Sequence, residues 1–422
     1  MEYVSVPTDI PDEQTPLLEV YDQIGPKSTF TQTTVNSLNL LMGMGLLSLP
    51  FAFYKLGWVL GLSLLVFFCM LACYTAYLIG KCMEFETGVG KLSSFYDIAY
   101  MAYGAPGKYF MVVLFSLELL AAAVAMLILF ADSLISLVPV LTPFKPQIMI
   151  GSILLLTPLT WQKSMSKISW VSFVGVLSLI VLTVAILWDG ITSPVGPGSI
   201  FDPQQTNMWP EDINQIGLGI GLLFVGLDGD QILNLGHAVF PSLYLDMIEK
   251  KRFGKSVSIT YTIVAMFYSL IGACGYLMFG NEIQPEVSQN LPLVPSFNVL
   301  LNQSALSFIA INPLTKYALI VHPVNSTIEG LFNIYSDTLT ILSRTFLSFL
   351  VLLIAIIFPS FYKVMGFIGA ALSFMTVVIM PTACYIRLSW DSVSWWSRFA
   401  HSCIIVFGFG FMTFGTYGVM TV

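Results

Sequence analysis

The chain has 422 residues, of which 56% are hydrophobic and only 10% are charged, and its formal net charge is −7. Soluble proteins carry about 25% charged residues, so this composition cannot cover a water-exposed surface and excludes an ordinary soluble protein. The apolar residues form continuous blocks of about 20 residues, the length of a membrane-spanning helix. These blocks lack the two-residue alternation of a transmembrane barrel, so we expect an all-α integral membrane protein.

Residues 1–27 precede the first apolar block, and we expect them to form a disordered tail on the cytosolic side. An acidic dileucine sorting pattern runs from Glu13 to Leu17 and Leu18, and a tyrosine-based pattern runs from Tyr21 to Ile24. Sorting adaptors bind such patterns as extended peptides, so the tail favours a vacuolar or lysosomal membrane, with the plasma membrane as second choice. Both patterns are short, and a chance match is the alternative.

Residues 28–420 are expected to form one transmembrane domain with eleven spans. The sixth span contains an interruption, the fourth is short and the third is long. The spans lie near 32–54, 58–82, 108–138, 146–161, 168–189, 212–248, 254–279, 299–324, 340–358, 361–386 and 396–420.

Lysine and arginine concentrate on one side of these spans, the side shared with the N-terminus. The positive-inside rule therefore places the N-terminus in the cytosol and, with an odd number of spans, the C-terminus in the lumen. The cluster from Lys250 to Lys255 is juxtamembrane, which is typical of a topology anchor and would allow contact with anionic lipid. No other basic patch suits nucleic acid, so the lipid bilayer is an expected partner and nucleic acid is not.

Two spans carry glycine and proline at matching positions. Gly45 is followed five residues later by Pro50, and Gly236 is followed five residues later by Pro241. Secondary transporters interrupt equivalent helices of two inverted repeats around a mid-membrane site. The pattern predicts repeats at about 32–189 and 212–386, plus one extra helix at about 396–420. The alternative is that small residues serve only helix packing.

Such interruptions suit a small zwitterion, because unwound backbone offers free amides and carbonyls. Amides near Gly45 would bind a carboxylate at a helix N-terminus, and the carbonyls near Leu41 and Gly226 would accept from an ammonium group. Glycine allows close approach of a ligand to the backbone. The predicted substrate-binding residues are Asn36, Asn39, Leu41, Met42, Gly43, Met44, Gly45, Leu46, Ser48, Gly226 and Leu227.

Ionisable groups within the spans are costly, so each needs a role or a partner. One of them could couple proton flow to transport, as histidine and buried carboxylates do elsewhere. The alternatives are structural: Lys316 would pair with an acid or a carbonyl, and His237 would cap the second half of the sixth helix. A sodium site between Asn39 and Thr315 is a further option. The ion-coupling candidates are Glu118, His237, Asp228, Thr315 and Lys316.

Three segments carry a family resemblance. They are NLLMGMGLLSLPFAFYKLGW at 39–58, GHAVFPSLYLDM at 236–247, and INPLTKYAL at 311–319 followed by Pro323. They resemble signatures of the amino acid/auxin permease family, in particular its vacuolar amino-acid transporter branch. The resemblance implies the five-plus-five inverted-repeat fold of the bacterial leucine transporter and proton- or ion-coupled amino-acid transport. Residues 230–236 depart from that pattern, because the family joins its Asp-Gly segment almost directly to the His-Ala-Val-Phe-Pro motif.

The function expected from these observations is secondary active transport of small amino acids, proton-coupled, as symport or antiport, by alternating access around helices one and six. Two other classes compete with it. An amino-acid sensor would use the same site, and an intramembrane protease would use Asp97 and Asp230, although the Gly-x-Gly-Asp arrangement of such proteases is absent. No metal-site or cofactor motif is present, so no metal and no cofactor are expected.

Overall fold

A computed structural model of the chain describes residues 28–85, 92–162, 170–228 and 236–422. Apart from one isolated pairing of Ser28 with Met247, the regular structure in these ranges is helical. The elements through residue 246 are α2 (Phe30–Leu41), η1 (Met44–Ser48), α3 (Leu49–Cys82), α4 (Phe95–Leu137), η2 (Pro139–Phe144), α5 (Lys145–Thr160), α6 (Trp170–Thr192), α7 (Ile213–Asp228) and α8 (Gly236–Asp246). The rest are η3 (Lys250–Arg252), α9 (Phe253–Phe279), η4 (Gly280–Glu282), α10 (Val287–Asn290), η5 (Leu291–Leu293), α11 (Val299–Leu331), α12 (Asp337–Ile357), α13 (Phe361–Phe367), η6 (Ile368–Ile379), α14 (Met380–Leu388) and α15 (Trp395–Thr421).

The helical membrane fold predicted from the sequence is confirmed. Eight helical stretches of the described residues are long and apolar enough to cross a membrane. One of them, Met44–Cys82, contains parts of two expected spans, because Gly57 divides it with a φ of +68°. Leu177–Thr192 and Ile213–Asp228 are shorter apolar helices that coincide with the fifth and sixth expected spans.

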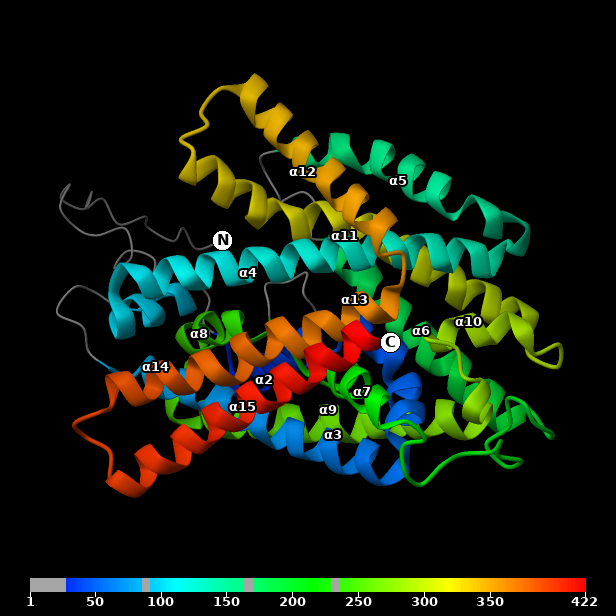
Figure 1. The fold of residues 1–422 in the computed structure, drawn as a ribbon, viewed down its shortest axis with the longest axis horizontal. Helices are drawn as coiled ribbons and strands as arrows, with labels where there is room; N and C mark the ends of the chain where they lie inside the picture. Colours follow the sequence, from blue (N-terminus) through cyan, green and yellow to red (C-terminus); the bar gives the residue numbers. More distant parts are fainter. Residues whose placement is uncertain (1–27, 86–91, 163–169, 229–235) are drawn as a thin grey trace, which may run out of the picture.

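The helices form two groups that lie against each other (Figure 1). In one group α3 packs along α7 and α9, and α2 crosses α9. In the other group α4 packs along α11, and α5 packs against α12. Helices two and seven, three and eight, and four and nine of the expected repeats are therefore mutual neighbours.

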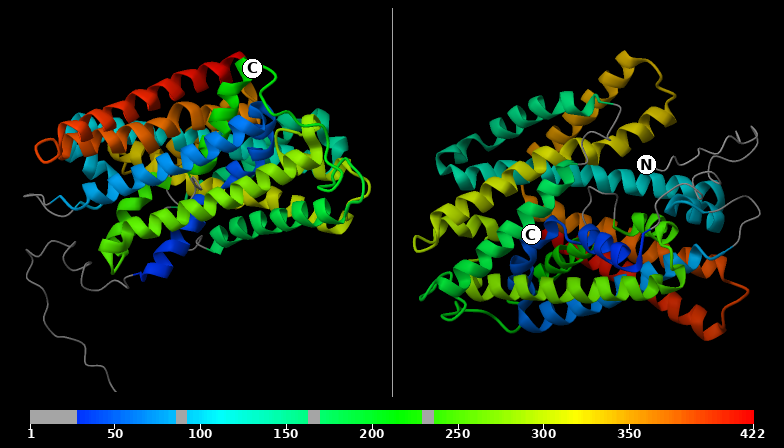
Figure 2. Two further views of the ribbon diagram at one scale, coloured as in Figure 1. Left: turned by 90° about the horizontal axis from the view of Figure 1, so that it is seen from below. Right: turned by 180° about the vertical axis from the view of Figure 1, so that it is seen from behind.

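The last helix, α15, runs along the outer edge of the bundle (Figure 2). It packs against α7 and η6, and glycines bring backbones close together in this region. A Cβ added to Gly217 would lie 2.8 Å from the Cα of Gly418, and one added to Gly221 would lie 2.2 Å from the carbonyl oxygen of Gly366. Only glycine permits backbones to approach this closely. Glycines thus fit the sixth helix closely to the added helix at Gly217 and to the tenth helix at Gly221.

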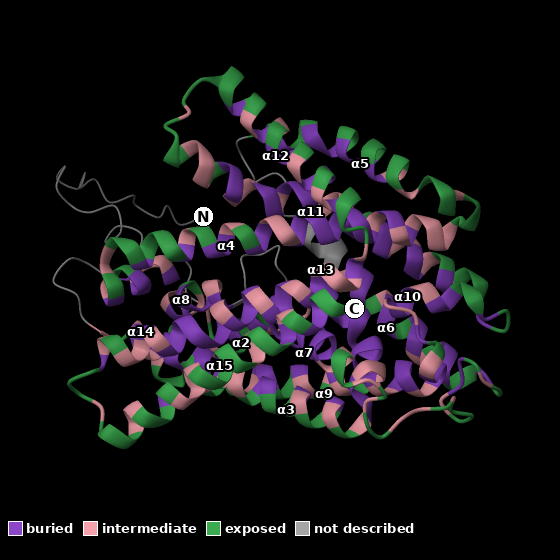
Figure 3. Ribbon diagram, viewed as in Figure 1, coloured by how far each residue is buried: buried purple, intermediate pink, exposed green. Residues whose placement is uncertain are grey.

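The outward faces of α12 and α15 contain many exposed residues (Figure 3), and large apolar side chains are among them. Phe346, Leu353, Val406 and Phe407 are each more than half exposed. A water-soluble surface would not carry so many exposed apolar side chains, so these faces are suited to lipid. The buried side chains gather between the two groups, where the site is expected.

The third helix differs from the expected span near 108–138. It begins at Phe95, where the Ser94 side chain caps the helix, and it bends at Gly104, which has a φ of +70°. Asp97 falls between the expected spans near 58–82 and 108–138, but it lies in the first turn of this helix and accepts hydrogen bonds from the backbone amides of Ser93 and Ser94. Sequence periodicity missed this first segment because it is short and partly polar.

Candidate functional site

The first helix is interrupted at the position predicted from the sequence. α2 ends at Leu41, Met42 and Gly43 leave the helical conformation, and the 3₁₀ segment η1 begins at Met44. Gly43 is extended, with φ −115° and ψ −171°. The α7 half of the sixth helix ends at Asp228 and α8 begins at Gly236. Most of the additional stretch noted at 230–236, including Asp230, lies outside the described residues.

Tyr268 of α9 joins the ends of the two helices. Its hydroxyl oxygen lies 2.8 Å from the carbonyl oxygen of Leu41 and 2.9 Å from that of Gly226. The side chain is fully buried. Two carbonyls that the sequence predicted as ammonium acceptors are therefore brought together. Sequence reasoning missed Tyr268, although a hydroxyl within an apolar span is a signal that could have found it.

The predicted substrate-binding residues separate into two sets. Those at the helix interruption are buried: Leu41, Gly43, Met44, Gly45, Leu46, Ser48, Gly226 and Leu227. Among them, the Ser48 hydroxyl has no hydrogen-bond partner within the described part of the chain. Gly45 lies directly against the backbone of Gly226. The residue that was predicted to lie close to a ligand therefore also forms a close contact between two helices.

The other three predicted residues, Asn36, Asn39 and Met42, face a cavity of about 610 Å³ between α2 and α6. Val35 and Ile180 at its edge are about half exposed, so the cavity opens at the protein surface. Met42 belongs to the helix interruption itself. The lining consists of Val35, Asn36, Leu38, Asn39, Met42, Leu179, Ile180, Thr183, Val184 and Phe267. The cavity therefore extends from the surface to the interruption in the first helix.

Two buried carboxyl groups meet beside the end of α7. The Ser373 Oγ of η6 lies 3.0 Å from Glu118 Oε1 of α4 and 2.7 Å from Asp228 Oδ2. Glu118 is 0% exposed and Asp228 is 1% exposed. A serine hydroxyl has a single hydrogen to donate, so satisfying both contacts requires the second carboxyl to donate its own O–H to Ser373. The sequence proposed both acids but missed the serine that connects them.

The position of Ser373 follows from its helix. η6 is a π-helical segment within the tenth span, a geometry that often occurs at functional sites. The adjacent Phe374 stacks on Phe224 of α7, with 3.8 Å between ring centroids. Phe68 of α3 and Phe411 of α15 pack around this pair. This aromatic cluster holds η6 against α7, so Ser373 stays beside Asp228.

The other ion-coupling candidates lie in separate surroundings. His237 is fully buried, and its Nε2 lies 3.2 Å from the carbonyl oxygen of Ala72 and 3.1 Å from Thr75 Oγ1. Since a carbonyl only accepts, Nε2 carries a hydrogen and connects α8 to α3. The Thr315 hydroxyl donates to the backbone of Asn312, and Lys316 is buried in α11.

The predicted sorting signals and the expectation of no metal site both remain predictions. The sorting residues Glu13, Leu17, Leu18, Tyr21 and Ile24 lie outside the described residues. Over the ranges that the structure describes, no group of three or more histidine, cysteine or acidic side chains could hold a metal ion.

An interrupted first helix, two helix groups that each combine helices of both expected repeats, and a buried acid pair at their junction define a membrane transporter of the inverted-repeat class. The family model for transmembrane amino acid transporter proteins matches residues 26–421. The chain therefore belongs to that family, and the resemblance inferred from its motifs is confirmed. The family and its relatives are transporters, so the chain is not an enzyme, and the protease interpretation based on Asp97 and Asp230 is set aside.

Individual relatives agree with this assignment, and solved structures agree with the fold. The chain is 30% identical over 412 residues to amino acid transporter AVT1D of Arabidopsis thaliana, covering 93% of this chain and 70% of that protein. It is 31% identical over 379 residues to AVT1I of the same plant, covering 87% and 88%. Its fold is similar to that of Mhp1 in an inward-facing conformation, with a TM-score of 0.57 and 12% identity over 94% and 90% of the chains. A manganese transporter of Eremococcus coleocola has a TM-score of 0.52 and 14% identity, over 98% and 97%.

Proposed function

We propose that this protein is a proton-coupled secondary transporter that moves small amino acids across a vacuolar or lysosomal membrane by alternating access. One observation carries the proposal: the interrupted first helix meets the end of α7 beside the carboxyl pair Glu118–Asp228. The substrate groups and the coupling proton would then use adjacent parts of one junction.

The backbone at the interruption suits the two ends of an amino acid. The amides of Met44 and Gly45 precede the first hydrogen bond of η1, which Leu46 donates to Gly43 at 3.3 Å, so they can bind a carboxylate. A carbonyl oxygen has two lone pairs, so Leu41 and Gly226 keep acceptor capacity for an ammonium group although both contact Tyr268. The unpartnered Ser48 hydroxyl adds a further donor.

The carboxyl pair suits the coupling role. Two ionised carboxylates this close in a dry setting repel each other, so we propose that the pair holds one proton through Ser373. Asp228 is the last described residue of α7, so a change in that helix alters the pair. Movement of the proton would thereby be linked to movement of the helix.

The cavity between α2 and α6 is the proposed route between the site and one side of the membrane. It reaches Met42 and is lined by the amides of Asn36 and Asn39. Because a two-residue interruption separates α2 from η1, α2 can tilt relative to η1 without breaking a continuous helix. Such a tilt would widen or close this route, as alternating access requires.

The proposed membrane and sidedness rest on sequence features. The sorting patterns at Glu13–Leu18 and Tyr21–Ile24 favour a vacuolar or lysosomal destination through adaptor binding. The excess of lysine and arginine on one side favours a cytosolic N-terminus and a luminal C-terminus.

The test is amino-acid flux in proteoliposomes that contain the purified chain, under an imposed pH gradient. The wild type would be compared with Glu118→Gln and, as a control for charge, with Asp391→Asn in the exposed turn before α15. Gradient-driven flux in the wild type and control, with loss in Glu118→Gln, is the expected result. Binding without flux under pH, sodium or voltage gradients would favour the sensor, and flux driven only by sodium would reject proton coupling.

A further inference from the structure

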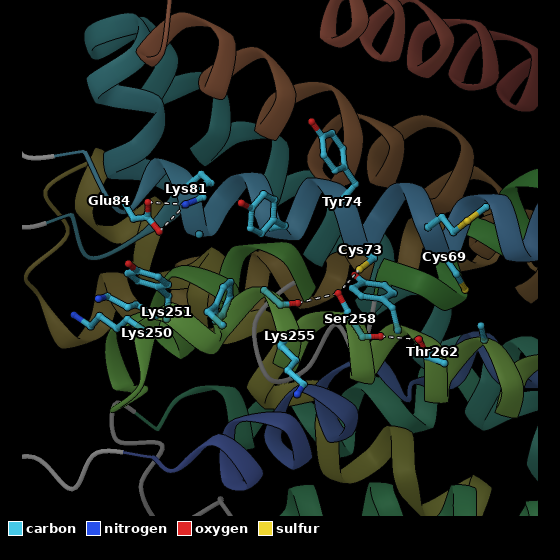
Figure 4. A pocket seen from close by; sticks show the side chains of 18 of the residues that line it. Cys69, Cys73, Tyr74, Lys81, Glu84, Lys250, Lys251, Lys255, Ser258 and Thr262 are labelled. Carbon is cyan, nitrogen blue, oxygen red and sulfur yellow. Dashed lines mark hydrogen bonds and ion pairs between the residues drawn. The ribbon is translucent and has the colours of Figure 1, made fainter. Parts of the chain in front are cut away.

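A second hollow lies on the membrane-facing side of the protein, away from the helix interruption. It runs between α3 and α9 and has a volume of about 770 Å³ (Figure 4). We call it the α3–α9 groove. Its wall includes residues from Val66 to Glu84 of α3 and the following turn, and residues from Phe253 to Met266 of α9. None of the residues proposed for substrate binding lines it.

One end of the groove is basic. Lys81, Lys250, Lys251 and Lys255 line it, with Glu84 beside Lys81 (Figure 4). Lys81 is neutralised by this glutamate, since its Nζ lies 2.9 Å from a carboxylate oxygen of Glu84. Lys251 is exposed and Lys250 is partly exposed, and no carboxylate among the described residues lies within ion-pair distance of either. This end therefore has a net positive charge.

The remainder of the groove is apolar and open at the surface. Met70 is 60% exposed, Met266 is 68% exposed and Val66 is 46% exposed. Tyr74 and Tyr77 lie on the α3 wall between this portion and the lysines. Tyrosine is typical of the region where lipid headgroups meet acyl chains. Along the groove, cationic side chains are thus followed by aromatic side chains and then by apolar ones.

Small residues help to give the groove its shape. A Cβ added to Gly80 would lie 2.7 Å from the ring of Phe253, and one added to Gly254 would lie 2.9 Å from the ring of Tyr77. These rings therefore fold back over glycine positions on the facing helix. The glycines let α3 and α9 approach each other at the floor of the groove while the surface remains hollow.

We propose that the α3–α9 groove is a binding site for one anionic phospholipid. Its phosphate and acidic headgroup would contact Lys250 and Lys251, and one acyl chain would lie along Met70 and Met266. A zwitterionic lipid would leave the lysines without a net anionic partner, and a free anion would leave the apolar portion unfilled. These lysines lie on the side expected to be cytosolic, where anionic lipids produce a negative surface potential. The inference does not depend on the proposed transport mechanism.

The test is native mass spectrometry of the full chain in detergent with palmitoyl-oleoyl phosphatidylserine or, for comparison, phosphatidylcholine. The charge variant is Lys250→Gln/Lys251→Gln. The matched control is Lys108→Gln/Arg387→Gln, which removes the same charge from exposed positions outside the groove. Ser258→Phe adds bulk to the groove without changing charge. Thermal unfolding of each variant checks that it is folded.

We expect phosphatidylserine to bind in preference to phosphatidylcholine. Lys250→Gln/Lys251→Gln should weaken this binding about 25-fold, since each juxtamembrane lysine contributes about fivefold. Ser258→Phe should also weaken it, and the control should leave it within twofold. Equal loss in the control would mean non-specific attraction to a basic surface, and unchanged binding in the folded charge variant would mean that lipid binds elsewhere. Either result would overturn the proposal.

Discussion

Gly45 and Gly226 meet backbone to backbone where the first and sixth helices cross. A Cβ added to Gly45 would lie 2.5 Å from the Cα of Gly226 and 2.9 Å from its nitrogen, whereas a Cβ added to Gly226 would approach the Tyr268 ring at 3.2 Å. The contact is asymmetric: a side chain at Gly45 meets backbone, and one at Gly226 meets a ring edge that can shift slightly.

This asymmetry predicts different costs for two alanine substitutions. Gly45→Ala should abolish transport and destabilise the protein by about 1–3 kcal/mol, the usual cost of overpacking. Gly226→Ala should retain folding and part of the transport activity. Thermal unfolding and proteoliposome flux of both variants are the measurements. Equal effects of the two substitutions would argue against the crossing described here.

Ser373→Ala should uncouple transport from the pH gradient. The substitution leaves Glu118 and Asp228 buried without the hydroxyl that contacts both, at a cost of about 1–3 kcal/mol. We expect gradient-driven uptake to fall roughly tenfold, while exchange of labelled for unlabelled amino acid is kept. Uptake and exchange are measured in the same proteoliposomes. Ser373→Thr keeps the hydroxyl and is the matched control, and wild-type coupling in Ser373→Ala would contradict the proposed role.

The side chain of Arg344 in α12 is expected to stabilise the fold where α5, α11 and α12 meet. The side chain is 2% exposed, and its Nε and Nη2 lie 2.6 and 3.1 Å from the carboxylate oxygens of Glu329. Its Nη1 donates to the carbonyls of Thr160 and Gln162. Arg344→Ala should cost about 3–5 kcal/mol, because Glu329 loses its partner.

A lysine at this position tests the geometry of the contact. Arg344→Lys keeps the charge but not the planar fork, so it should recover only part of the melting temperature. Full recovery by lysine would show that charge alone is required.

The carboxyl group of Glu286, the residue before α10, is expected to make the stability of the folded chain depend on pH. It is 1% exposed, and burial, with the nearby charge of Asp132, raises the pKa of its carboxyl well above the usual range, against the opposing effect of Lys145. The folded chain therefore keeps this proton at pH values where the unfolded chain has released it. This contribution to stability is present at acidic pH and is lost as pH rises.

Glu286→Gln should remove that dependence. The variant and the wild type should melt at similar temperatures at low pH, and the variant should be the more stable of the two at pH 8. Melting curves across this range make the comparison. A parallel pH dependence in both proteins would assign it to other groups.

Several parts of this arrangement were predictable from the sequence. Apolar blocks located the spans, and the glycines at Gly43 and Gly45 located the helix interruption, because both signals are local. The contact of Ser373 with Glu118 and Asp228 was not predictable, since it joins residues 255 and 145 positions apart. The segment before Gly104 was missed for a different reason: only a positive φ at that glycine separates it from the rest of α4.

The glycine contacts between α7, α15 and the tenth helix have a consequence for motion. Interdigitated side chains resist axial displacement, since each must change rotamer to pass its neighbour. Where Gly217 faces Gly418, and Gly221 faces Gly366, nearly flat backbone surfaces meet. Small shear displacements between packed helices are a common mode of conformational change. α7 can therefore shift slightly against α15 at Gly217 and against α13 at Gly221 while both contacts are kept.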